Sequence, residues 1–373
     1  MQRSPKTRLY HASLNLGVML GLPAAIKRTL LEVAEAYDDR KDYATAMRLL
    51  IPLALKGHAV SQHYVALMYD KGRGTTPDAT RALKWYRRAG NRGDVDSQYA
   101  VAIMLANGLG TEQNEAEALR WYRLAAEQGN SGAQFDLGAV YYFGQGVSQN
   151  YGEAARWFRL AAVKGNAKAQ SNLGSMYGTG LGVPQDKSEA LKWFHLAANQ
   201  GHASAQFNLG WAYGEGLGVK QDYAEAAKWY RLAAEQGDAA SQNSLGSLYG
   251  FGHGIPQDQR EALKWFQRAA DQGHKLAQAN VGIDAAARGD YTTALKLLHP
   301  VAQAGNAIAQ FNLGLMYQHG HGVPVDFMEA HMWFSIARSD DQRVKLEMNM
   351  THEQVEQART MAKNRLASQY KIG

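Results

Sequence analysis

The sequence predicts an all-α protein, a solenoid in which helical hairpins stack one on the next. Three observations support this. A tryptophan recurs every 36 residues, and so does a glutamine. Each 36-residue interval also contains two sets of small or apolar residues at the spacing of one helix face, here called helical stripes. The tryptophans are Trp85, Trp121, Trp157, Trp193, Trp229 and Trp265, and the glutamines are Gln62, Gln98, Gln134, Gln170, Gln206, Gln242 and Gln278. Each tryptophan lies 23 residues after the glutamine of its unit, which fixes the register of the repeat.

Each 36-residue unit has the pattern of a pair of antiparallel helices. In the unit of Gln170, one helix face continues at i+3, i+4 and i+7 with Leu173, Gly174 and Tyr177. A second stripe consists of Ala190, Trp193, Phe194, Ala197 and Ala198, and Gly201 follows it. Small residues allow two helices to approach closely and aromatic residues fill wider gaps, so we expect the two stripes to pack together.

The segment between the two stripes, Gly178-Thr-Gly-Leu-Gly-Val183, has two interpretations. It resembles a phosphate-binding loop, but such a loop occurs once and carries a Lys-Ser/Thr pair that is missing here. Glycine pairs recur at Gly72/Gly74, Gly108/Gly110, Gly144/Gly146, Gly216/Gly218, Gly252/Gly254 and Gly320/Gly322. We therefore expect a turn that ends the first helix, followed by an aspartate that caps the second. The expected caps include Asp186, Asp222 and Asp258.

Shorter units flank the regular array. Gln310 follows Gln278 by only 32 residues, and the segment 290–302 closely repeats the segment 42–54. A polar stretch at 339–343 precedes a capping box at 351–354 and a last helix. The predicted organisation is an N-terminal segment 1–25, a short repeat 26–61, six regular repeats 62–277, a short repeat 278–309, a last repeat 310–340, and a capping helix with tail 341–373.

Composition excludes several classes of protein. The chain has 373 residues, of which 46% are hydrophobic, enough to bury a core. Its net charge of +6 favours anionic partners only if the charge gathers on one face. It has no cysteine, which excludes disulfides, thiolate metal sites and a thiol nucleophile. No apolar run approaches the roughly 20 residues that span a bilayer, so we expect no membrane span.

The N-terminal segment leaves the cellular compartment open. Arg3, Lys6 and Arg8 precede an apolar stretch at 14–25, as in a secretory signal, but Asn15 and two glycines interrupt that stretch. The alternative is an irregular start to the first helix. The sequence is compatible with a periplasmic or exported protein and equally with a cytoplasmic one.

One unit carries the pattern of a known repeat: it reads Ala205-Gln-Phe-Asn-Leu-Gly-Trp-Ala-Tyr-Gly-Glu-Gly-Leu-Gly-Val219, then Asp222-Tyr-Ala-Glu-Ala-Ala-Lys-Trp-Tyr-Arg-Leu-Ala-Ala234. This pattern resembles the Sel1-like repeat, a relative of the tetratricopeptide repeat, over roughly residues 34–338. The resemblance implies a right-handed superhelix of antiparallel helix pairs. It also implies a bacterial scaffold or adaptor that holds other proteins or peptides, often in signalling.

A partner is expected on the face of the first helices that the packing stripe leaves free, which resembles the concave surface of tetratricopeptide-like arrays. Counted from each glutamine, positions +1, +5, +8 and +9 form this face. The candidates on it are Tyr99, Ile103, Asn107, Phe135, Tyr142, Phe143, Phe207, Trp211, Glu215 and Phe251. Aromatic residues that do not recur are free of a packing duty and suit a peptide groove. For the recurring Phe135, Phe207 and Phe311 at position +1, the alternative is a place in the core.

The second helices carry a basic row that could bind nucleic acid or another anionic polymer. The row consists of Lys84, Arg120, Arg156, Lys192, Lys228 and Lys264. Three residues before these lie Glu117, Glu153, Glu189, Glu225 and Glu261, at the spacing of ion pairs on a helix surface. We therefore expect a self-compensated outer surface and no nucleic-acid binding.

No catalytic or metal-binding motif stands out. His58, His202 and His274 share one repeat position where Asn or Asp stands in other units, which indicates residues at helix starts. No acidic partner recurs with His253, His319 and His321, so we expect no metal site. The sequence has no Gly-x-Ser-x-Gly elbow and no complete phosphate-binding loop.

These observations together predict a non-enzymatic scaffold that binds a protein or peptide on its concave face, without a cofactor. Two alternatives stay open: an enzyme or small-molecule binder with a pocket between layers, and an anionic-polymer binder that uses the basic row. A non-recurring cluster of buried polar residues would favour the pocket, and none stands out in the sequence. The partner is not identified by the sequence, and a monomer is the expected state.

Overall fold

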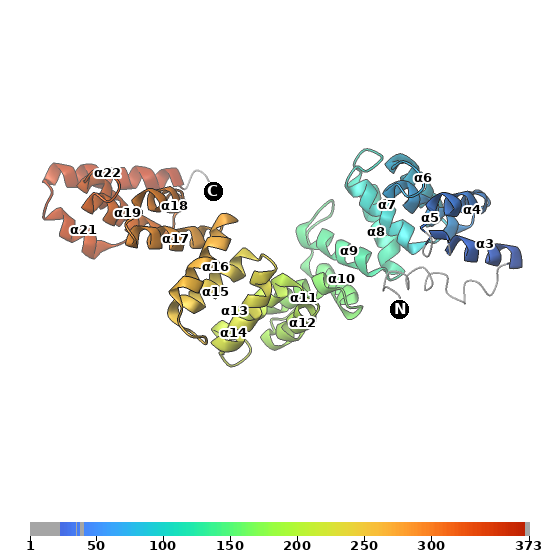
Figure 1. The fold of residues 1–373 in the computed structure, drawn as a ribbon, viewed down its shortest axis with the longest axis horizontal. Helices are drawn as coiled ribbons and strands as arrows, with labels where there is room; N and C mark the ends of the chain where they lie inside the picture. Colours follow the sequence, from blue (N-terminus) through green and yellow to red (C-terminus); the bar gives the residue numbers. More distant parts are fainter. Residues whose placement is uncertain (1–22, 35, 38–40, 370–373) are drawn as a thin grey trace. The chain divides into compact units, whose positions relative to one another are not determined.

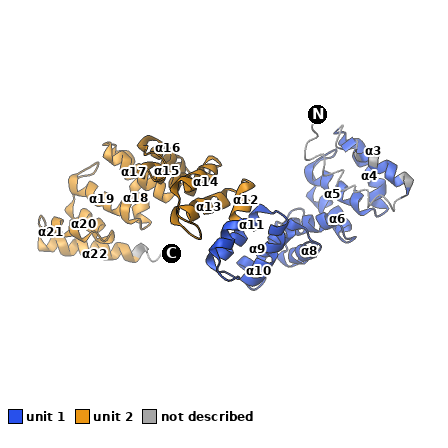
Figure 2. Cartoon of the chain, turned by 90° about the horizontal axis from the view of Figure 1, so that it is seen from below, with its two compact units in different colours: residues 1–193 blue, residues 194–373 orange. Residues whose placement is uncertain are grey.

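The computed structural model describes residues 23–34, 36–37 and 41–369, and the regular elements among them are helices (Figure 1). The chain divides into two compact units, residues 1–193 and 194–373, and the division falls inside α12 (Lys187–Asn199) (Figure 2). The first unit contains α3 (Ala24–Ala34), α4 (Tyr43–Leu55), α5 (Ala59–Lys71), α6 (Ala79–Gly90), α7 (Val95–Ala106), α8 (Glu115–Glu127), α9 (Ser131–Phe143), α10 (Tyr151–Val163) and α11 (Ala167–Thr179). The second contains α13 (Ala203–Glu215), α14 (Tyr223–Glu235), α15 (Ala239–Phe251), α16 (Gln259–Asp271), α17 (Lys275–Ala287), α18 (Tyr291–Gln303), α19 (Ala307–His319), α20 (Phe327–Ile336), α21 (Asp340–Glu347) and α22 (His352–Gln369).

Within each unit, a helix packs on the helices that precede and follow it in sequence. In the first unit the hairpins are α5 with α6, α7 with α8, and α9 with α10. In the second they are α13 with α14, α15 with α16, α17 with α18, and α19 with α20. Consecutive hairpins stack through pairs such as α8 with α9 and α14 with α15. The predicted all-α solenoid of helix pairs is therefore confirmed within each unit.

The recurring glycine pairs form turns, as predicted. Gly144 ends α9 with φ of 71° and Gly180 ends α11 with φ of 77°, both in the left-handed region. The second glycines of the same turns, Gly146 and Gly182, have φ of 68° and 72°. A residue with a Cβ loses roughly 1–2 kcal/mol in this conformation, which explains why glycine recurs.

The predicted aspartate caps are also confirmed. An Oδ1 atom of Asp222 accepts a hydrogen bond from the amide of Glu225 at 2.9 Å, and Asp186 accepts from the amide of Glu189 at 3.0 Å. Asp258 caps α16 in the same way. Each cap satisfies a backbone donor at the start of a second helix and so fixes where that helix begins.

The recurring glutamine ties successive hairpins together. Gln98 Nε2 donates to the carbonyl of Gly90 at 3.0 Å, and its Oε1 accepts from Gln128 Nε2 at 2.7 Å. The bond to the carbonyl eight residues earlier is repeated at Gln62, Gln134, Gln170, Gln206, Gln242, Gln278 and Gln310. A buried amide requires hydrogen-bond partners, and these bonds supply one for the Nε2 group at each joint between a second helix and the next first helix.

Another recurring glycine lies inside the first helix, under an aromatic ring of the second. A Cβ at Gly138 would lie 2.7 Å from the ring of Phe158, and a Cβ at Gly210 would lie 2.6 Å from the ring of Tyr230. These distances are shorter than any ordinary carbon–carbon contact. Glycine at this position therefore sets how closely the two helices of a hairpin approach.

The C-terminal helices α21 and α22 both pack on α20. The backbone amide of Gln354 donates to Thr351 Oγ1 at 3.3 Å, and the amide of Thr351 donates to Gln354 Oε1 at 2.8 Å, which confirms the capping box. The following helix, α22, buries Val355, Ala358 and Ala362 on one side. The proposed repeat boundaries stay predictions, and the N-terminal segment 1–25 lies almost wholly outside the described residues.

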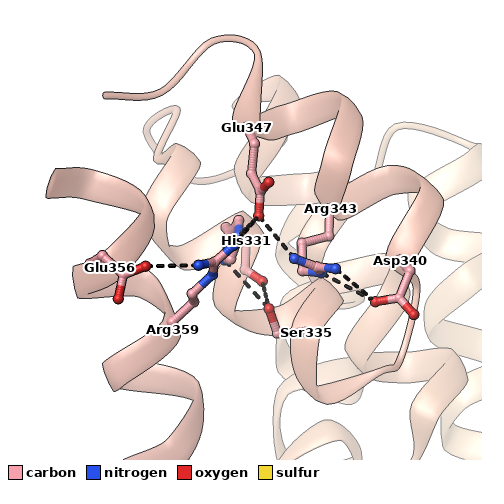
Figure 3. Close-up of polar contacts among 7 residues, drawn as sticks. All are labelled: His331, Ser335, Asp340, Arg343, Glu347, Glu356 and Arg359. Carbon is pink, nitrogen blue, oxygen red and sulfur yellow. Dashed lines mark hydrogen bonds and ion pairs between the residues drawn. The ribbon is translucent and has the colours of Figure 1, made fainter. Parts of the chain in front are cut away.

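One short helix, α21, was not predicted, because it occupies a polar stretch without a helical stripe. A polar network joins it to α20 and α22 (Figure 3). His331 of α20 is fully buried, and its Nε2 lies 2.9 Å from Glu347 Oε1. Arg343 Nη1 donates to the same oxygen at 2.9 Å and Arg359 Nη2 at 3.4 Å. The hydrogen bond from His331, followed by the two arginine charges, holds the pKa of Glu347 below its ordinary value.

Candidate partner-binding site

Six of the predicted binding residues lie on the first helices of the first unit. They are Tyr99 and Ile103 of α7, which are half-buried against the core, the exposed C-cap residue Asn107, and Phe135, Tyr142 and Phe143 of α9. Phe143 is 66% exposed, whereas Tyr142 beside it is only partly exposed. We call the surface formed by positions +1, +5, +8 and +9 of the repeats the first-helix face.

The other four predicted residues lie in the second unit. Phe207, Trp211 and Glu215 belong to α13, and Phe251 ends α15. Trp211 is 51% exposed and Phe251 is 73% exposed. The ring of Phe251 stacks on the imidazole of His253, with 5.6 Å between the ring centroids. Large apolar side chains thus lie open to solvent on the first-helix face of this unit.

The recurring phenylalanines at position +1 pack inside their own hairpins. Ring centroids are 5.6 Å apart for Phe135 and Phe158, and 5.8 Å apart for Phe207 and Tyr230. Phe311 makes the same kind of contact with an aromatic ring of α20. These contacts agree with the core alternative for this position. Any contribution of these rings to a binding surface comes from their exposed edges alone.

Tyr142 also packs against its own hairpin. Its ring centroid lies 5.2 Å from that of Tyr151, the first residue of α10, and 6.4 Å from that of Phe158. The ring therefore fills the space between the end of α9 and the start of α10. Of the two neighbouring candidates, Phe143 presents the larger free apolar surface.

A cavity of about 340 Å³ opens between α7, α8 and α9. It is lined by Asn107, one of the predicted residues, and by Glu115, Tyr122, Asp136 and Gln145, which the sequence analysis did not select. Cavities of a few hundred Å³ are the usual size of small-ligand and side-chain pockets. The structure thus places a pocket with two carboxylates beside the first-helix face.

Asp136 and Tyr99 form a polar pair at this cavity. Tyr99 Oη donates to Asp136 Oδ2 at 2.8 Å, from the neighbouring hairpin. Gly132 allows this approach, because a Cβ there would lie 2.8 Å from the Tyr99 ring. Burial raises the pKa of Asp136, while the hydrogen bond from Tyr99 and the charge of Lys168 oppose that rise. Burial, followed by the nearby charge of Asp136, likewise raises the pKa of Tyr99.

A signal for Asp136 existed in the sequence. The same position, +2 from the glutamine, carries Asn172, Asn208, Asn280 and Asn312 in other repeats. A carboxylate in place of a recurring amide is a departure from the repeat. The departures selected above were mainly aromatic residues, and Asp136 was not among them.

Comparison with protein families decides which kind of repeat this is. The Sel1 repeat model matches residues 59–94, 95–130, 131–166, 167–202, 203–238, 239–274 and 307–340, which is more than half of the chain. The chain belongs to the Sel1 repeat family. This confirms the resemblance stated from the sequence.

Two solved structures of Sel1 type are similar to this chain. One is described as a protective antigen present in uropathogenic Escherichia coli strains that displays an SLR fold; it is 30% identical over 87% of this chain and 80% of its own, with a TM-score of 0.71. The other is a Sel1 repeat protein from Oxalobacter formigenes, 31% identical over 64% of this chain and 95% of its own, with a TM-score of 0.58. No curated protein matches the chain.

The second helices of these Sel1 repeats carry the predicted ion pairs. Nitrogen–oxygen distances are 3.2 Å for Arg156 and Glu153, 2.8 Å for Lys192 and Glu189, and 2.7 Å for Lys228 and Glu225. Lys264 pairs with Glu261 in the same way. The basic row is therefore compensated as expected at these four positions, whereas Glu117, which was expected to pair with Arg120, pairs with Arg87 of the preceding hairpin at 3.0 Å. Its free positive charge is smaller than the count of lysines and arginines suggests.

The histidines of the Sel1 repeats serve as helix starts and ring partners. His58 and His274 are N-cap residues of α5 and α17, as predicted, and the ring of His321 stacks on that of Tyr291 at 4.6 Å. Among the described residues, no three His, Asp or Glu side chains lie close enough to share a metal ion. In the same part of the chain, none of the helices combines the length and apolar character of a membrane span.

Proposed function

We propose that this Sel1 repeat chain is a non-enzymatic scaffold that binds a protein partner through the first-helix face. Sel1 repeat proteins are generally protein-interaction scaffolds, and their fold is not typically enzymatic. The observation that carries the proposal is the exposure of Phe143, Trp211 and Phe251, which are between 51% and 73% exposed. Exposed aromatic side chains on a repeat surface supply the apolar contact area on which protein recognition depends.

Comparison with other exposed apolar residues sharpens this choice. Leu124, Leu160, Leu196 and Leu232 of the second helices are also partly exposed, but they stand at one repeat position. A residue that recurs in successive repeats is a property of the repeat itself. The three exposed aromatic residues stand at positions where other repeats carry different side chains, such as Thr179 and Ser175. They therefore mark particular places on the face rather than the face in general.

Site-specific photocrosslinking in the native host tests the proposal. A benzoylphenylalanine is placed at position 143, 211 or 251, and in matched controls at positions 160 and 232 of the second helices. We expect a discrete partner to crosslink from the first-helix positions and not from the controls. Equal capture from both sets of positions, or capture from the second helices alone, would place the binding surface elsewhere.

A second step measures what the aromatic side chains contribute. The purified partner is titrated with Phe143→Ser and Trp211→Ser variants, and with Leu160→Ser as the control. Truncation of an aromatic anchor at an interface typically weakens binding by more than about 1 kcal/mol, which is roughly fivefold or more. Unchanged affinity in both aromatic variants would contradict the proposed role of these residues.

A further inference from the structure

The cavity between α7, α8 and α9 lies at a junction where the turn of one hairpin does not contact the start of the second helix of the preceding hairpin. Gly110, Gly182 and Gly254 are each the second glycine of a turn that lies against the second helix of the preceding hairpin. A Cβ on any of them would lie 2.2–2.4 Å from the backbone at the start of that helix. At Gly146, the nearest atom would be Glu115 Oε2, at 3.8 Å. The turn of Gly146 therefore stands off from the start of α8, and Gln145 beside it lines the cavity.

The side chains beside the turn also differ between hairpins, although an aromatic residue is not required for a tight junction, because α6 begins with Ala79 at the tight junction of Gly110. The first residue of the second helix is aromatic in several units, at Tyr43, Tyr151, Tyr223, Tyr291 and Phe327, but is Glu115 here. In the next hairpin, Tyr151 and Tyr142 fill the corresponding space with two rings. Here Ala106 and Glu115 line the cavity instead. The space that two aromatic rings occupy in one hairpin is left free in the other.

Hydrogen bonding at this junction also departs from the repeat. Gln149 and Gln185 each donate to the backbone carbonyl at position +8 of their own repeat, both at 2.8 Å. Their counterpart Gln113 donates instead to Glu115 Oε1 at 3.3 Å. Its amide thus holds the Glu115 carboxylate at the mouth of the cavity.

The chemistry of the walls is unlike that of the other repeats. Glu115 and Asp136 bring two carboxylates to one cavity, at positions where other repeats carry an aromatic ring and an amide. Ala118, Leu119 and Val140 supply an apolar wall. The cation whose charge acts on Asp136 is Lys168 of α11, an exposed side chain whose Nζ lies 6.0 Å from the centre of the Phe135 ring. Apolar walls that end in carboxylates suit an aliphatic stem with a cationic end.

We propose that this cavity binds a lysine or arginine side chain of the partner that occupies the first-helix face. The inference rests on the proposed function, since Asn107 of that face lines the cavity and Tyr99 of the same face holds Asp136. The stem of the bound side chain lies against Leu119 and Val140. Its charged group lies between the carboxylates of Glu115 and Asp136, which supply charge-assisted hydrogen bonds.

Methyl NMR of the full chain tests the cavity without knowledge of the partner. The probes are Nα-acetyl-arginine N-methylamide and its norleucine counterpart, which has a similar stem and no charge. We expect saturable shifts of the Leu119 and Val140 methyl signals with the arginine probe and none with norleucine. Equal shifts with both probes, or no saturable shift with arginine, would overturn the cavity assignment.

Three variants separate binding from folding. Asp136→Asn restores the amide found at this position in other repeats, so it should fold, and we expect affinity for the arginine probe to fall roughly tenfold or more. Glu115→Tyr restores the aromatic residue of other repeats and should abolish the shifts by filling the cavity. Glu127→Gln changes the net charge equally on an exposed part of α8 and should leave the affinity unchanged. An affinity unchanged by Asp136→Asn would overturn the inference.

Partner capture distinguishes this inference from the proposed function. If position 143 captures a partner and Asp136→Asn weakens that capture, the cavity holds a side chain of the partner. If the arginine probe binds but capture is unaffected by Asp136→Asn, the cavity is a site for small cations and the assignment to the partner fails. If the probe binds and no partner is captured from any first-helix position, the proposed function fails while the cation site remains.

Discussion

Two neighbouring junctions of the first unit differ in how closely the turn approaches the preceding second helix. At Gly182, the turn lies against the start of α10, and Tyr142, Tyr151 and Phe158 fill the hairpin. At Gly146, the turn has nearly the same backbone conformation, yet a cavity lies between it and α8. The side chains beside the two turns differ as well, because Ala106 and Glu115 stand where Tyr142 and Tyr151 stand one repeat later. A repeat array can thus acquire a pocket by a local departure, while the turns and caps around it are retained.

The largest expected effect is a difference in stability loss between two aromatic residues, Phe158 and Tyr122, which occupy the same position in successive second helices. Phe158 is buried against Gly138, Phe135 and Tyr142, and Phe158→Ala should lower the free energy of unfolding by roughly 3–5 kcal/mol. Tyr122 lines the cavity on one side, so Tyr122→Ala should cost less. Urea unfolding of the full chain measures both losses, and hydrogen exchange locates them within the array. Equal losses would mean that the space beside Tyr122 is not open.

The next contrast uses the turn glycines themselves. Gly182→Ala brings a Cβ to 2.2 Å from the carbonyl oxygen of Tyr151 and also imposes a left-handed conformation, so the loss of stability should be roughly 2–4 kcal/mol. Gly146→Ala imposes the same conformation without the clash and should cost about 1–2 kcal/mol. Thermal and urea unfolding of the two variants side by side provide the measurement. The comparison would be wrong if Gly146→Ala proved the more damaging change.

Filling the open junction should have a moderate and favourable effect. Glu115→Tyr places an aromatic ring where Tyr151 lies in the next repeat, and cavity filling of this kind typically adds about 0.5–2 kcal/mol to stability. Glu115→Gln keeps the cavity and should leave stability close to that of the native chain. The melting temperatures of the three proteins, with the arginine probe absent, test this. A tyrosine variant less stable than the glutamine variant would show that the space cannot accept a ring.

The smallest effect concerns pH. Burial raises the pKa of Asp136 above the ordinary 3.8, so ionisation of this carboxyl disfavours the folded state. This penalty develops as the pH rises from about 3.8 through the raised pKa, and it is complete above that pKa. Asp136→Asn should therefore be slightly more stable than the native chain at pH 7, and the difference should vanish towards pH 4. Melting temperatures of the two proteins measured across this range test the direction of the effect. A stability difference that grows as the pH falls would contradict the prediction.

Much of the fold could be predicted because the repeat is encoded locally. The two stripes, the glycine turns and the aspartate caps each depend on residues within about two helical turns of each other, and the same signals recur every 36 residues. Helix α21 could not be predicted in this way, because its place depends on Glu347 meeting His331 of α20 and Arg359 of α22. Contacts between elements, rather than a stripe within one element, hold that helix.

The candidate site was predictable only in part. Non-recurrence selected Tyr142 and Phe143 alike, but adjacent residues on a helix point about 100° apart, so one packs inside its hairpin and the other faces solvent. Glu115 and Asp136 are visible as departures from the repeat, yet they belong to successive hairpins. Only the stacking of α9 on α8 brings them to one cavity.

The glutamine joint described above makes the hairpins interchangeable. Every hairpin of the regular array offers the same carbonyl at the end of its second helix and the same amide in the first helix that follows. A hairpin inserted or deleted as a whole would therefore meet matching partners on both sides, whereas an insertion of a few residues would misplace the amide. Such an array can lengthen or shorten by recombination between its own repeats. A feature divided between two hairpins, such as the pair Glu115 and Asp136, would then be inherited only when both hairpins move together.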